Sequence, residues 1–215
     1  MSQEKVWIIT GASRGIGLEV ARRAIAAGER VALIARGESV LTAASELGEN
    51  AVGIQADVSD AVSVQAANDQ VLEKWGRIDF VVNNAGIHRG GKVGRLPLED
   101  WQAVINTNLT GALNVISAAR ASLQEGSSIV NVGAVVGFRG FPGDVAYGAS
   151  KAGLAGLTRA LAIELAGKGI CVNLVIPGLV LTDMTGALSD KALESMRKTV
   201  PMGRYGEPQE IAEVI

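Results

Sequence analysis

The sequence predicts a single α/β domain, in which helices cover both faces of a doubly wound parallel sheet to give three layers. Three observations support this fold class. Short apolar runs rich in β-branched residues alternate with longer segments of helical periodicity along the 215 residues. The apolar runs show little polar alternation, which is typical of strands buried on both faces. No linker, repeat or change in composition divides the chain.

The expected elements follow one another in a regular strand–helix order. Strands are expected at 5–10, 30–35, 51–55, 78–83, 127–133 and 170–176, and helices at 15–27, 39–48, 59–74, 98–123 and 147–168. In such a sheet, ligands bind beyond the carboxyl ends of the strands, so the residues that follow each strand are the candidates for a site. A last helix is expected from Pro208, and no cap follows it before Ile215.

Composition excludes several classes of function. The net charge is −2 and no block of Lys and Arg is present, so nothing predicts binding to nucleic acid or to an anionic membrane. Three Trp, two Tyr and three Phe are too few to form a platform for stacking bases. The first apolar run, 6–9, is too short for a signal peptide, and no stretch approaches about 18 uninterrupted apolar residues. We therefore expect a cytoplasmic protein.

Two residue types that often carry chemistry occur once each. Cys171 lies in the apolar run 170–176, where we expect it to pack as a small buried side chain in a reducing compartment. His88 is the single histidine, so a multi-histidine metal site is not available and no metal is expected. We expect His88 in the loop after the fourth strand, near the entrance to a site. An incidental role in this loop is favoured over contact with a substrate.

A glycine-rich turn links the first expected strand to the first expected helix. Glycines allow a tight turn and a close approach of the backbone to a ligand, and the free N–H groups of a helix N-terminus suit a pyrophosphate. The spacing is GxxxGxG, and such a turn alone is equally compatible with a purely structural role. The residues expected to hold a dinucleotide here are Gly11, Ser13, Arg14, Gly15, Ile16 and Gly17.

The end of the second strand favours a phosphorylated ribose. A site selective for NAD usually offers a carboxylate to the adenosine ribose here, whereas this chain has Arg36. A guanidinium suits the 2′-phosphate of NADPH, and Arg14 could supply a second positive charge. Glu38 lies close enough to leave some use of NAD open. The alternative is that both arginines are ordinary solvated residues.

The ends of two further strands carry polar or small residues. Asp57 and Val58 follow the third strand, and Asn84, Ala85 and Gly86 close the fourth. The Asp57 carboxylate could accept a hydrogen bond from an adenine amine, and small residues let the backbone lie against a ribose. Each of these residues alone also fits a helix cap or a turn. Together they outline one groove that continues from the glycine-rich turn.

Tyr147 and Lys151 are four residues apart and therefore share one face of the helix expected at 147–168. A phenol has a pKa near 10 and is a poor acid–base group at neutral pH. A neighbouring ammonium favours the phenolate and is expected to lower the phenol pKa toward the working range. The spacing is common by chance, so a structural role for this pair alone stays open.

In combination these motifs resemble those of the short-chain dehydrogenase/reductase family, over essentially the whole chain. The resemblance rests on TGASRGIG at 10–17, Asp57, NNAG at 83–86, Asn108, YGASK at 147–151, and Pro177-Gly178 with Thr182. The stretches 182–185 and 200–206, with Glu210-Ile211-Ala212, further resemble the 3-oxoacyl-[acyl-carrier-protein] reductases. The resemblance implies a Rossmann-like sheet and one NADP-binding reductase domain over 1–215. Because the family usually adds a seventh strand, this domain is expected to lack its C-terminal strand.

The resemblance also implies a role for each matching residue. Tyr147 would protonate the developing alkoxide, Lys151 would lower its pKa and hold the nicotinamide ribose, and Asn108 would support a water chain that resupplies the proton. The nicotinamide side would be lined by four residues of the loop after the sixth strand, which could otherwise be an ordinary connection: Pro177, Gly178, Val180 and Thr182.

One position departs from the family pattern. The family places a serine thirteen residues before the tyrosine, where its hydroxyl bonds the substrate oxygen, and this chain has Ala134 there. Alanine offers no side-chain donor, and the loss of one such donor typically costs about 10²–10³ in rate. We therefore expect a serine-to-alanine variant of low activity, whether the change is natural or introduced by design.

The expected function is the NADPH-dependent reduction of a 3-oxoacyl thioester linked to acyl carrier protein, as in fatty acid biosynthesis. The resemblance implies a homotetramer, with the helices around 109–123 and 147–165 packed between subunits. Two alternatives stay open: a secondary-alcohol or small-ketone dehydrogenase of the same family, and a catalytically silent NADP-binding protein. Four basic residues could meet an acidic carrier protein, although solvated surface is the favoured interpretation for each: Arg89, Lys92, Arg95 and Lys168.

Overall fold

Six parallel strands form one sheet in the order β3-β2-β1-β4-β5-β6. The computed structural model describes residues 4–183 and 190–215. The strands are β1 (Val6–Thr10), β2 (Arg30–Ala35), β3 (Ala51–Gln55), β4 (Phe80–Asn83), β5 (Ser128–Val132) and β6 (Cys171–Val175). The order reverses between β1 and β4, so the first and fourth strand ends lie side by side, as a doubly wound sheet requires. The predicted Rossmann-like parallel sheet is confirmed.

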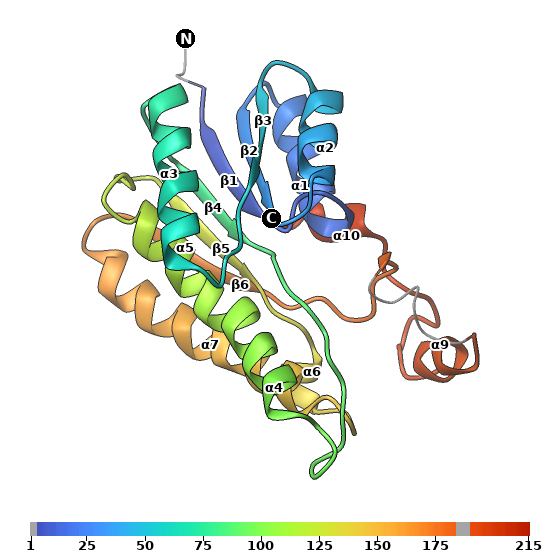
Figure 1. The fold of residues 1–215 in the computed structure, drawn as a ribbon. Coiled ribbons are helices and arrows are strands. Elements are labelled where there is room, and N and C mark those ends of the chain that lie inside the picture. The colour runs from blue at the N-terminus through green and yellow to red at the C-terminus, as the bar shows by residue number, and fades with distance from the viewer. Residues whose placement is uncertain (1–3, 184–189) are drawn as a thin grey trace.

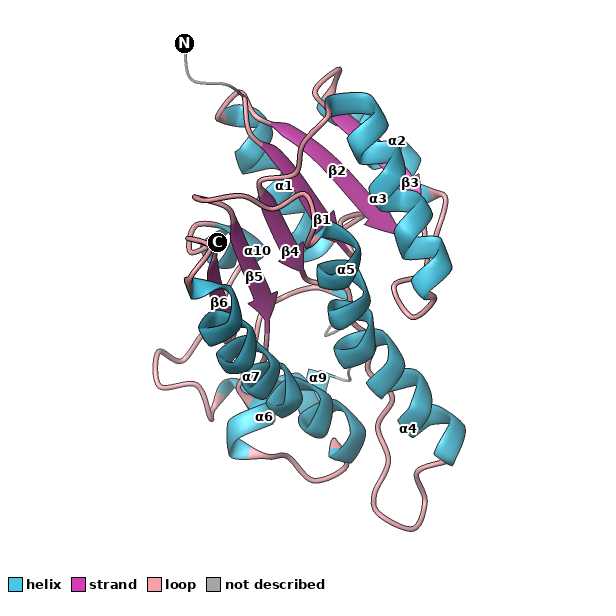
Figure 2. Ribbon diagram, turned by 90° about the vertical axis from the view of Figure 1, so that its left-hand side faces the viewer, coloured by secondary structure: helices cyan, strands magenta, loops and turns pink. Residues whose placement is uncertain are grey.

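Helices cover both faces of this sheet, and Figure 1 shows the resulting layers. One face is covered by α3 (Ala61–Trp75), α5 (Gly111–Ala119) and α7 (Val145–Ala166). The other face is covered by α1 (Gly15–Ala26), α2 (Ser39–Leu47) and the short α10 (Pro208–Ala212). Beyond the carboxyl ends of the strands lie α4 (Leu98–Ile105) and α6 (Val136–Arg139), as Figure 2 shows, and α9 (Asp190–Arg197) precedes α10.

The alternation of side chains along the strands divides the core into two parts. Ile8 of β1 packs on the α3, α5 and α7 side, whereas Ile9 packs on the α1 and α2 side. The register pairs Ile9 with Leu33 of β2 and Val82 of β4, and all three belong to the same core. Burial on both faces explains why the runs lack polar alternation. No helix among the described residues is long and apolar enough to cross a membrane.

The predicted helix 98–123 is interrupted in the structure. The chain is helical from Leu98 to Ala119, but a π-helical turn, η1 (Asn106–Thr110), lies between α4 and α5. A π turn inserts one extra residue per turn and so changes which side chains point to the core. The apolar pattern of the sequence did not predict this turn, and it did not predict α6 or α9.

The prediction that Cys171 is buried is wrong, because this residue is exposed. It is the first residue of β6, which forms the edge of the sheet. Its neighbour Val172 packs toward α7, so Cys171 points to the opposite face.

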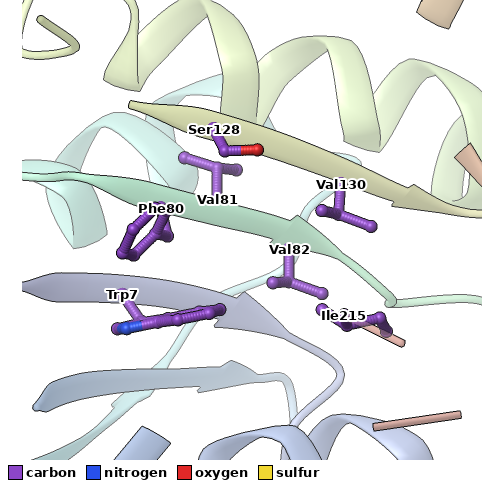
Figure 3. A pocket seen from close by; sticks show the side chains of 7 residues that line it. All are labelled: Trp7, Phe80, Val81, Val82, Ser128, Val130 and Ile215. Carbon is purple, nitrogen blue, oxygen red and sulfur yellow. The ribbon is translucent and has the colours of Figure 1, made fainter. Parts of the chain in front are cut away.

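A hollow of about 240 Å³ lies on the face of the sheet that carries α1 and α10. Figure 3 shows Trp7, Phe80, Val82 and Val130 along it, with Ile215 beside them. The lining holds no side chain that titrates near neutral pH, and it follows the length of β1, β4 and β5 rather than their carboxyl ends. We therefore place the candidate functional site elsewhere, at the carboxyl ends.

Candidate functional site

The turns after β1 and β4 are joined by hydrogen bonds. Thr10 Oγ1 accepts from the backbone N–H groups of Asn84 and Ala85, at 3.1 and 3.0 Å. The side-chain amide of Asn84 donates in return to the carbonyl oxygens of Thr10 and Gly11, at 3.0 and 3.1 Å. The structure thus uses the Asn84 side chain to shape the glycine-rich turn. Thr10 had no predicted role, although a threonine that ends a strand beside this turn was a usable signal.

Two glycines of the turn are required by the packing of the protein itself. Gly11 has φ of +64°, and a Cβ there would lie 2.8 Å from the Cα of Ala85. A Cβ on Gly17 would lie 2.6 Å from Asn84 Nδ2. Gly15 also has a positive φ, of +57°, but its nearest neighbour would be Thr182 Cγ2 at 3.5 Å. The packing of the turn therefore requires glycine at both positions, and cofactor binding by the turn stays a prediction.

The N-terminus of α1 has the properties of an anion site. Its N-cap residue, Arg14, makes no side-chain capping bond, and no acidic residue lies in the first turn. The positive end of the helix dipole is therefore not neutralised by residues of α1 itself. Ser13 is half-buried beside it, and Ile16 packs against the core and anchors the first turn. This arrangement fits the pyrophosphate of a dinucleotide.

Arg36 and Asp57 meet at the ends of β2 and β3. Arg36 Nη1 lies 3.9 Å from Asp57 Oδ2, and both side chains are partly exposed. Burial acts to raise the pKa of Asp57, but the two hydrogen bonds from Ser59 and the charge of Arg36 outweigh it and lower the pKa. Asp57 is therefore a charged acceptor at neutral pH. Val58 is buried, and its carbonyl oxygen accepts from Asn114 Nδ2 at 2.9 Å.

Arg14 is not free to face a ligand in this structure. Its Nη1 lies 2.9 Å from Asp183 Oδ2, and both side chains are largely exposed. A solvated pair of this kind is worth about 0 to 1 kcal/mol, so a phosphate can compete for the guanidinium. The pair joins the glycine-rich turn to the loop after β6.

That loop lies over the glycine-rich turn. Pro177 is buried and Gly178 is exposed, and the Pro177 carbonyl accepts from the N–H of Val135 at 2.9 Å. Val180 is buried and forms a bridge to Gly206. Thr182 faces the glycine-rich turn, since a Cβ on Gly15 would lie 3.5 Å from its Cγ2. Met184 and Thr185 lie outside the described residues. They belong to the stretch 182–185, which resembles the 3-oxoacyl-[acyl-carrier-protein] reductases in sequence.

Lys151 is fully enclosed on the face of α7 that carries Tyr147. Its Nζ donates to the carbonyl oxygen of Val132, the last residue of β5, at 2.8 Å, and lies 5.7 Å from the centre of the Tyr147 ring. Burial lowers the pKa of Lys151 to about 8. No carboxylate among the described residues pairs with this ammonium. An ammonium that retains unused donors in an enclosed site fits the hydroxyl groups of a ribose.

The expected lowering of the Tyr147 pKa does not occur in this structure. Burial, and next the negative charge of Asp144, raise the pKa of Tyr147 to about 12. The Lys151 ammonium donates to the Val132 carbonyl oxygen rather than to the phenol. The phenol is therefore held in its protonated form, in which it can donate a proton.

Asn108 lies in the π-helical turn and ties three segments together. Its Oδ1 accepts from the N–H of Ile87 at 2.8 Å, and its Nδ2 donates to the Ile87 carbonyl at 3.0 Å and to Ser150 Oγ at 3.1 Å. Ser150 Oγ donates in turn to the Tyr147 carbonyl at 2.7 Å. A Cβ on Gly86 would lie 3.4 Å from Asn108 Oδ1 and 3.6 Å from Lys151 Nζ. The structure thus brings Gly86, Asn108 and Lys151 together.

Ala134 occupies the turn between β5 and α6. Its carbonyl oxygen accepts from the N–H of Gly137 at 3.0 Å. Gly137 packs against α7, because a Cβ there would lie 2.9 Å from the carbonyl carbon of Lys151. Ala134 therefore lies where β5 and α6 approach the Tyr147 and Lys151 helix, and its methyl group offers no hydrogen bond to this site.

His88 contacts two residues at the start of α7, and the favoured prediction of an incidental role for it in its loop stays a prediction. Its Nε2 lies 2.8 Å from Asp144 Oδ1, and its ring meets the Tyr147 ring edge-on with 5.2 Å between centres. Asp144 is the N-cap residue of α7. A polar residue shortly after the turn that closes β4 was the available signal, but its partner lies 56 residues away in the sequence.

Known proteins are similar to this chain in sequence over most of its length. A family model described as short chain dehydrogenase matches residues 5–193. Carbonyl reductase family member 4 of Danio rerio is 43% identical over 211 residues, which are 97% of this chain and 88% of that protein. The 3-oxoacyl-[acyl-carrier-protein] reductase of Homo sapiens is 42% identical over 215 residues, and the match covers 99% of this chain and 90% of the relative.

A solved structure is similar over the whole chain. The actinorhodin polyketide ketoreductase crystallised with NADPH matches with a TM-score of 0.92 and 37% sequence identity, covering 100% of this chain and 90% of its own. The similarity therefore extends over the sheet and both helical layers, including the carboxyl ends of the strands.

Proposed function

The chain belongs to the short-chain dehydrogenase/reductase family of oxidoreductases, and we propose that it binds NADPH and reduces the 3-oxo group of an acyl thioester carried by acyl carrier protein. The observation that carries this proposal is the enclosed Lys151 beside a protonated Tyr147. The pair and the glycine-rich turn both lie at the carboxyl ends of the strands. The product is the corresponding 3-hydroxyacyl thioester.

The residues of this chain would divide the work as follows. The cofactor, when bound, supplies a hydride to the carbonyl carbon. Tyr147 gives its phenolic proton to the carbonyl oxygen, and Lys151 holds the nicotinamide ribose and favours the phenolate that forms. Asn108 supports the water chain that returns a proton to Tyr147. These roles agree with the buried, hydrogen-bonded positions of Lys151 and Asn108.

The cofactor groove runs along the carboxyl ends of β1 to β4 and β6. The N–H groups at the start of α1 hold the pyrophosphate, and Arg36 binds the 2′-phosphate. Asp57 accepts from the adenine amine, while Ala85 and Gly86 lie against a ribose. Support comes from the uncapped N-terminus of α1 and from a structural relative crystallised with NADPH.

The proposal includes impaired turnover. Ala134 stands where a serine hydroxyl would hold the substrate oxygen, and the absence of one such donor typically lowers the rate by about 10²–10³. We expect NADPH to bind well and carbonyl groups to be reduced slowly. We further propose a cytoplasmic homotetramer, with α5 and α7 between subunits.

A second candidate is the reduction of small ketones, or the oxidation of secondary alcohols, by the same residues. It is favoured by the similarity to the carbonyl reductase of Danio rerio. A silent NADP-binding protein is the third, and Ala134 is the observation that favours it.

One set of measurements separates these candidates. NADPH and NADH are titrated by fluorescence, and single-turnover reduction is then followed with a 3-oxoacyl-carrier-protein, its thioester without the carrier, and a small ketone. The same assays are run on Ala134→Ser. The proposal predicts tighter binding of NADPH, slow reduction of the 3-oxoacyl substrates and faster reduction by the variant. Binding of NADPH without turnover by either protein would support the silent NADP-binding protein, and turnover of the small ketone alone would support the second candidate.

A further inference from the structure

Three side chains form a connected cluster where α7 begins. The His88 ring contacts the Tyr147 ring edge-on, with 5.2 Å between centres, and His88 Nε2 lies 2.8 Å from Asp144 Oδ1. Asp144 and Tyr147 belong to the first turn of one helix, whereas His88 comes from the loop after β4. The imidazole therefore lies beside the group that carries the reaction.

The loop that carries His88 is held on both sides. On one side, the backbone of Ile87 exchanges two hydrogen bonds with the Asn108 amide. On the other, the N–H of Gly91 donates to the carbonyl of Gly143 at 2.7 Å. A Cβ on Gly90 would lie only 3.2 Å from His88 Cε1, so the ring packs closely against its own loop. His88 is thus a positioned side chain.

The contact with Asp144 sets the chemistry of the imidazole. Because Asp144 bonds Nε2, Nδ1 is the ring nitrogen that is left for a ligand. The hydrogen bond to Asp144 is the main cause that raises the pKa of His88, against the opposing effect of partial burial. A protonated imidazole donates from both nitrogens. About a third of the side chain, 35%, is exposed, so a ligand can reach it.

The charged groups around this imidazole favour the same state. Asp144 is the acidic group in direct contact, and the Tyr147 phenol is neutral at the working pH. The neighbouring Arg89 is engaged by Asp100, at 2.6 Å. Lys151 contacts the Tyr147 ring but directs its ammonium to a backbone carbonyl. The carboxylate of Asp144 therefore favours the imidazolium form of His88.

We propose, building on the function proposed above, that the imidazolium of His88, oriented by Asp144, donates a hydrogen bond from Nδ1 to the carbonyl oxygen of the substrate. It thereby takes part of the role of the hydroxyl that is missing at Ala134. His88 stabilises the negative charge that develops on this oxygen, while Tyr147 still transfers the proton. This chain thus holds the substrate oxygen through His88 in place of a hydroxyl at position 134.

A double-mutant cycle tests this inference. The variants are His88→Phe, Ala134→Ser and the two combined, and kcat/KM is measured in single-turnover and steady-state assays. His88→Phe keeps a ring against Tyr147 but removes both donors. We expect it to lower kcat/KM by about 10- to 100-fold in the parent protein and by less than about threefold in the Ala134→Ser background, where the hydroxyl is restored. Arg89→Ala, in the same loop, serves as the control and is expected to have the same effect in both backgrounds.

The pH profile supplies a readout that a structural role would not change. The donor is the protonated form of His88, so kcat/KM of the parent should fall as the pH rises through the raised pKa of this group. This limb should be absent in His88→Phe. In Asp144→Asn it should move to lower pH, because the neutral amide no longer stabilises the imidazolium.

The outcomes distinguish this inference from the function on which it rests. Equal losses from His88→Phe in the presence and absence of the Ala134→Ser change would overturn the role of His88 and leave the proposed function intact. An unchanged pH limb in His88→Phe would overturn it too. Binding of NADPH by every variant, with no turnover of any carbonyl substrate, would contradict the proposed function and the inference together.

Discussion

The side-chain amide of Asn84 donates a hydrogen bond to the backbone carbonyl of Gly11, at 3.1 Å, and so joins the turns that follow β4 and β1. The same nitrogen also donates to the carbonyl of Thr10. These bonds cross the point where the strand order reverses, between the first and fourth strands. The shape of the glycine-rich turn therefore depends on a residue that lies 73 positions away in the sequence.

Asn84→Ala should destabilise the protein and weaken NADPH binding together. Each lost hydrogen bond is worth about 0.5–1.5 kcal/mol, and the carbonyl oxygens of the turn lose their donor, so the free energy of unfolding should fall by about 1–2 kcal/mol. Chemical denaturation and a fluorescence titration measure the two effects. Asn173→Ala, at an exposed position of the edge strand β6, is the matched control. A loss of NADPH affinity without any loss of stability would instead indicate that Asn84 binds the cofactor directly.

Gly17→Ala should be more harmful than an alanine substitution at an open glycine. The new Cβ would lie 2.6 Å from Asn84 Nδ2 and 2.8 Å from the Gly11 carbonyl oxygen, so it would displace the contacts just described. Overpacking of this kind typically costs about 1–3 kcal/mol. Gly167→Ala is the control, since Gly167 has helical φ and ψ angles and no atom within 4 Å of the new Cβ. We expect its thermal midpoint to be unchanged or slightly raised. Similar midpoints for the two variants would contradict this account.

The sequence predicts the sheet well, because apolar runs and parallel pairing follow the same physical rule. The strands at 30–35 and 51–55 are confirmed at both ends, and the others begin or end within two residues of their predicted limits. The position of the site at the carboxyl ends follows from this topology. The topology accordingly predicts that Asn84 lies close to the glycine-rich turn, as its hydrogen bonds to Thr10 and Gly11 confirm.

The features that the sequence did not predict depend on contacts between distant residues. The π-helical turn at Asn108 coincides with hydrogen bonds to Ile87. Helical periodicity cannot predict this contact, because Ile87 lies outside the helix. The contact of His88 with Asp144 likewise joins the loop after β4 to the start of α7. Cys171 lies in an apolar run, but its exposure is decided by its place at the edge of the sheet. The raised pKa of Tyr147 is caused first by burial and next by the charge of Asp144, and its spacing from Lys151 predicts neither.

Lys151→Met should stabilise the cofactor-free protein at neutral pH. Burial lowers the pKa of Lys151 from 10.5 to about 8, so the cost of enclosing the ammonium is fully present below the lower value. Between the two values the unfolded chain binds a proton that the folded protein does not, and the free energy of unfolding of the parent therefore rises with pH. The variant should be more stable at pH 7 by on the order of 2–3 kcal/mol, and this difference should shrink toward pH 10.

Urea unfolding of the parent and of Lys151→Met at several pH values measures this effect. Lys168→Met, which changes an exposed lysine beyond the end of α7, is the control and should show the same pH slope as the parent. A stability difference that does not vary between pH 7 and 10 would mean that Lys151 remains charged in the folded protein. The Lys151→Met variant should also bind NADPH more weakly, because the proposed contact with the ribose is lost.

Arg36→Ala should reduce the preference for NADPH over NADH. Arg36 lies at the end of β2, beside Asp57, and it is the basic side chain proposed to bind the 2′-phosphate. A hydrogen bond to a charged group is worth about 1.5–3 kcal/mol, which corresponds to a rise of roughly 10- to 100-fold in the Kd for NADPH. The Kd for NADH, which lacks this phosphate, should change by less than about threefold.

Two further arginines test whether this effect is local. Arg14→Ala should weaken NADPH binding less than Arg36→Ala, because a phosphate must first displace the exposed pair between Arg14 and Asp183. Arg120 follows the last residue of α5 and therefore lies toward the amino ends of the strands. Arg120→Ala removes the same charge without touching the groove. If Arg120→Ala raised the Kd for NADPH as much as Arg36→Ala, overall charge and not a specific contact would account for the preference. If neither Arg36→Ala nor Arg14→Ala altered the ratio of the Kd for NADPH to the Kd for NADH, the 2′-phosphate would have to bind elsewhere.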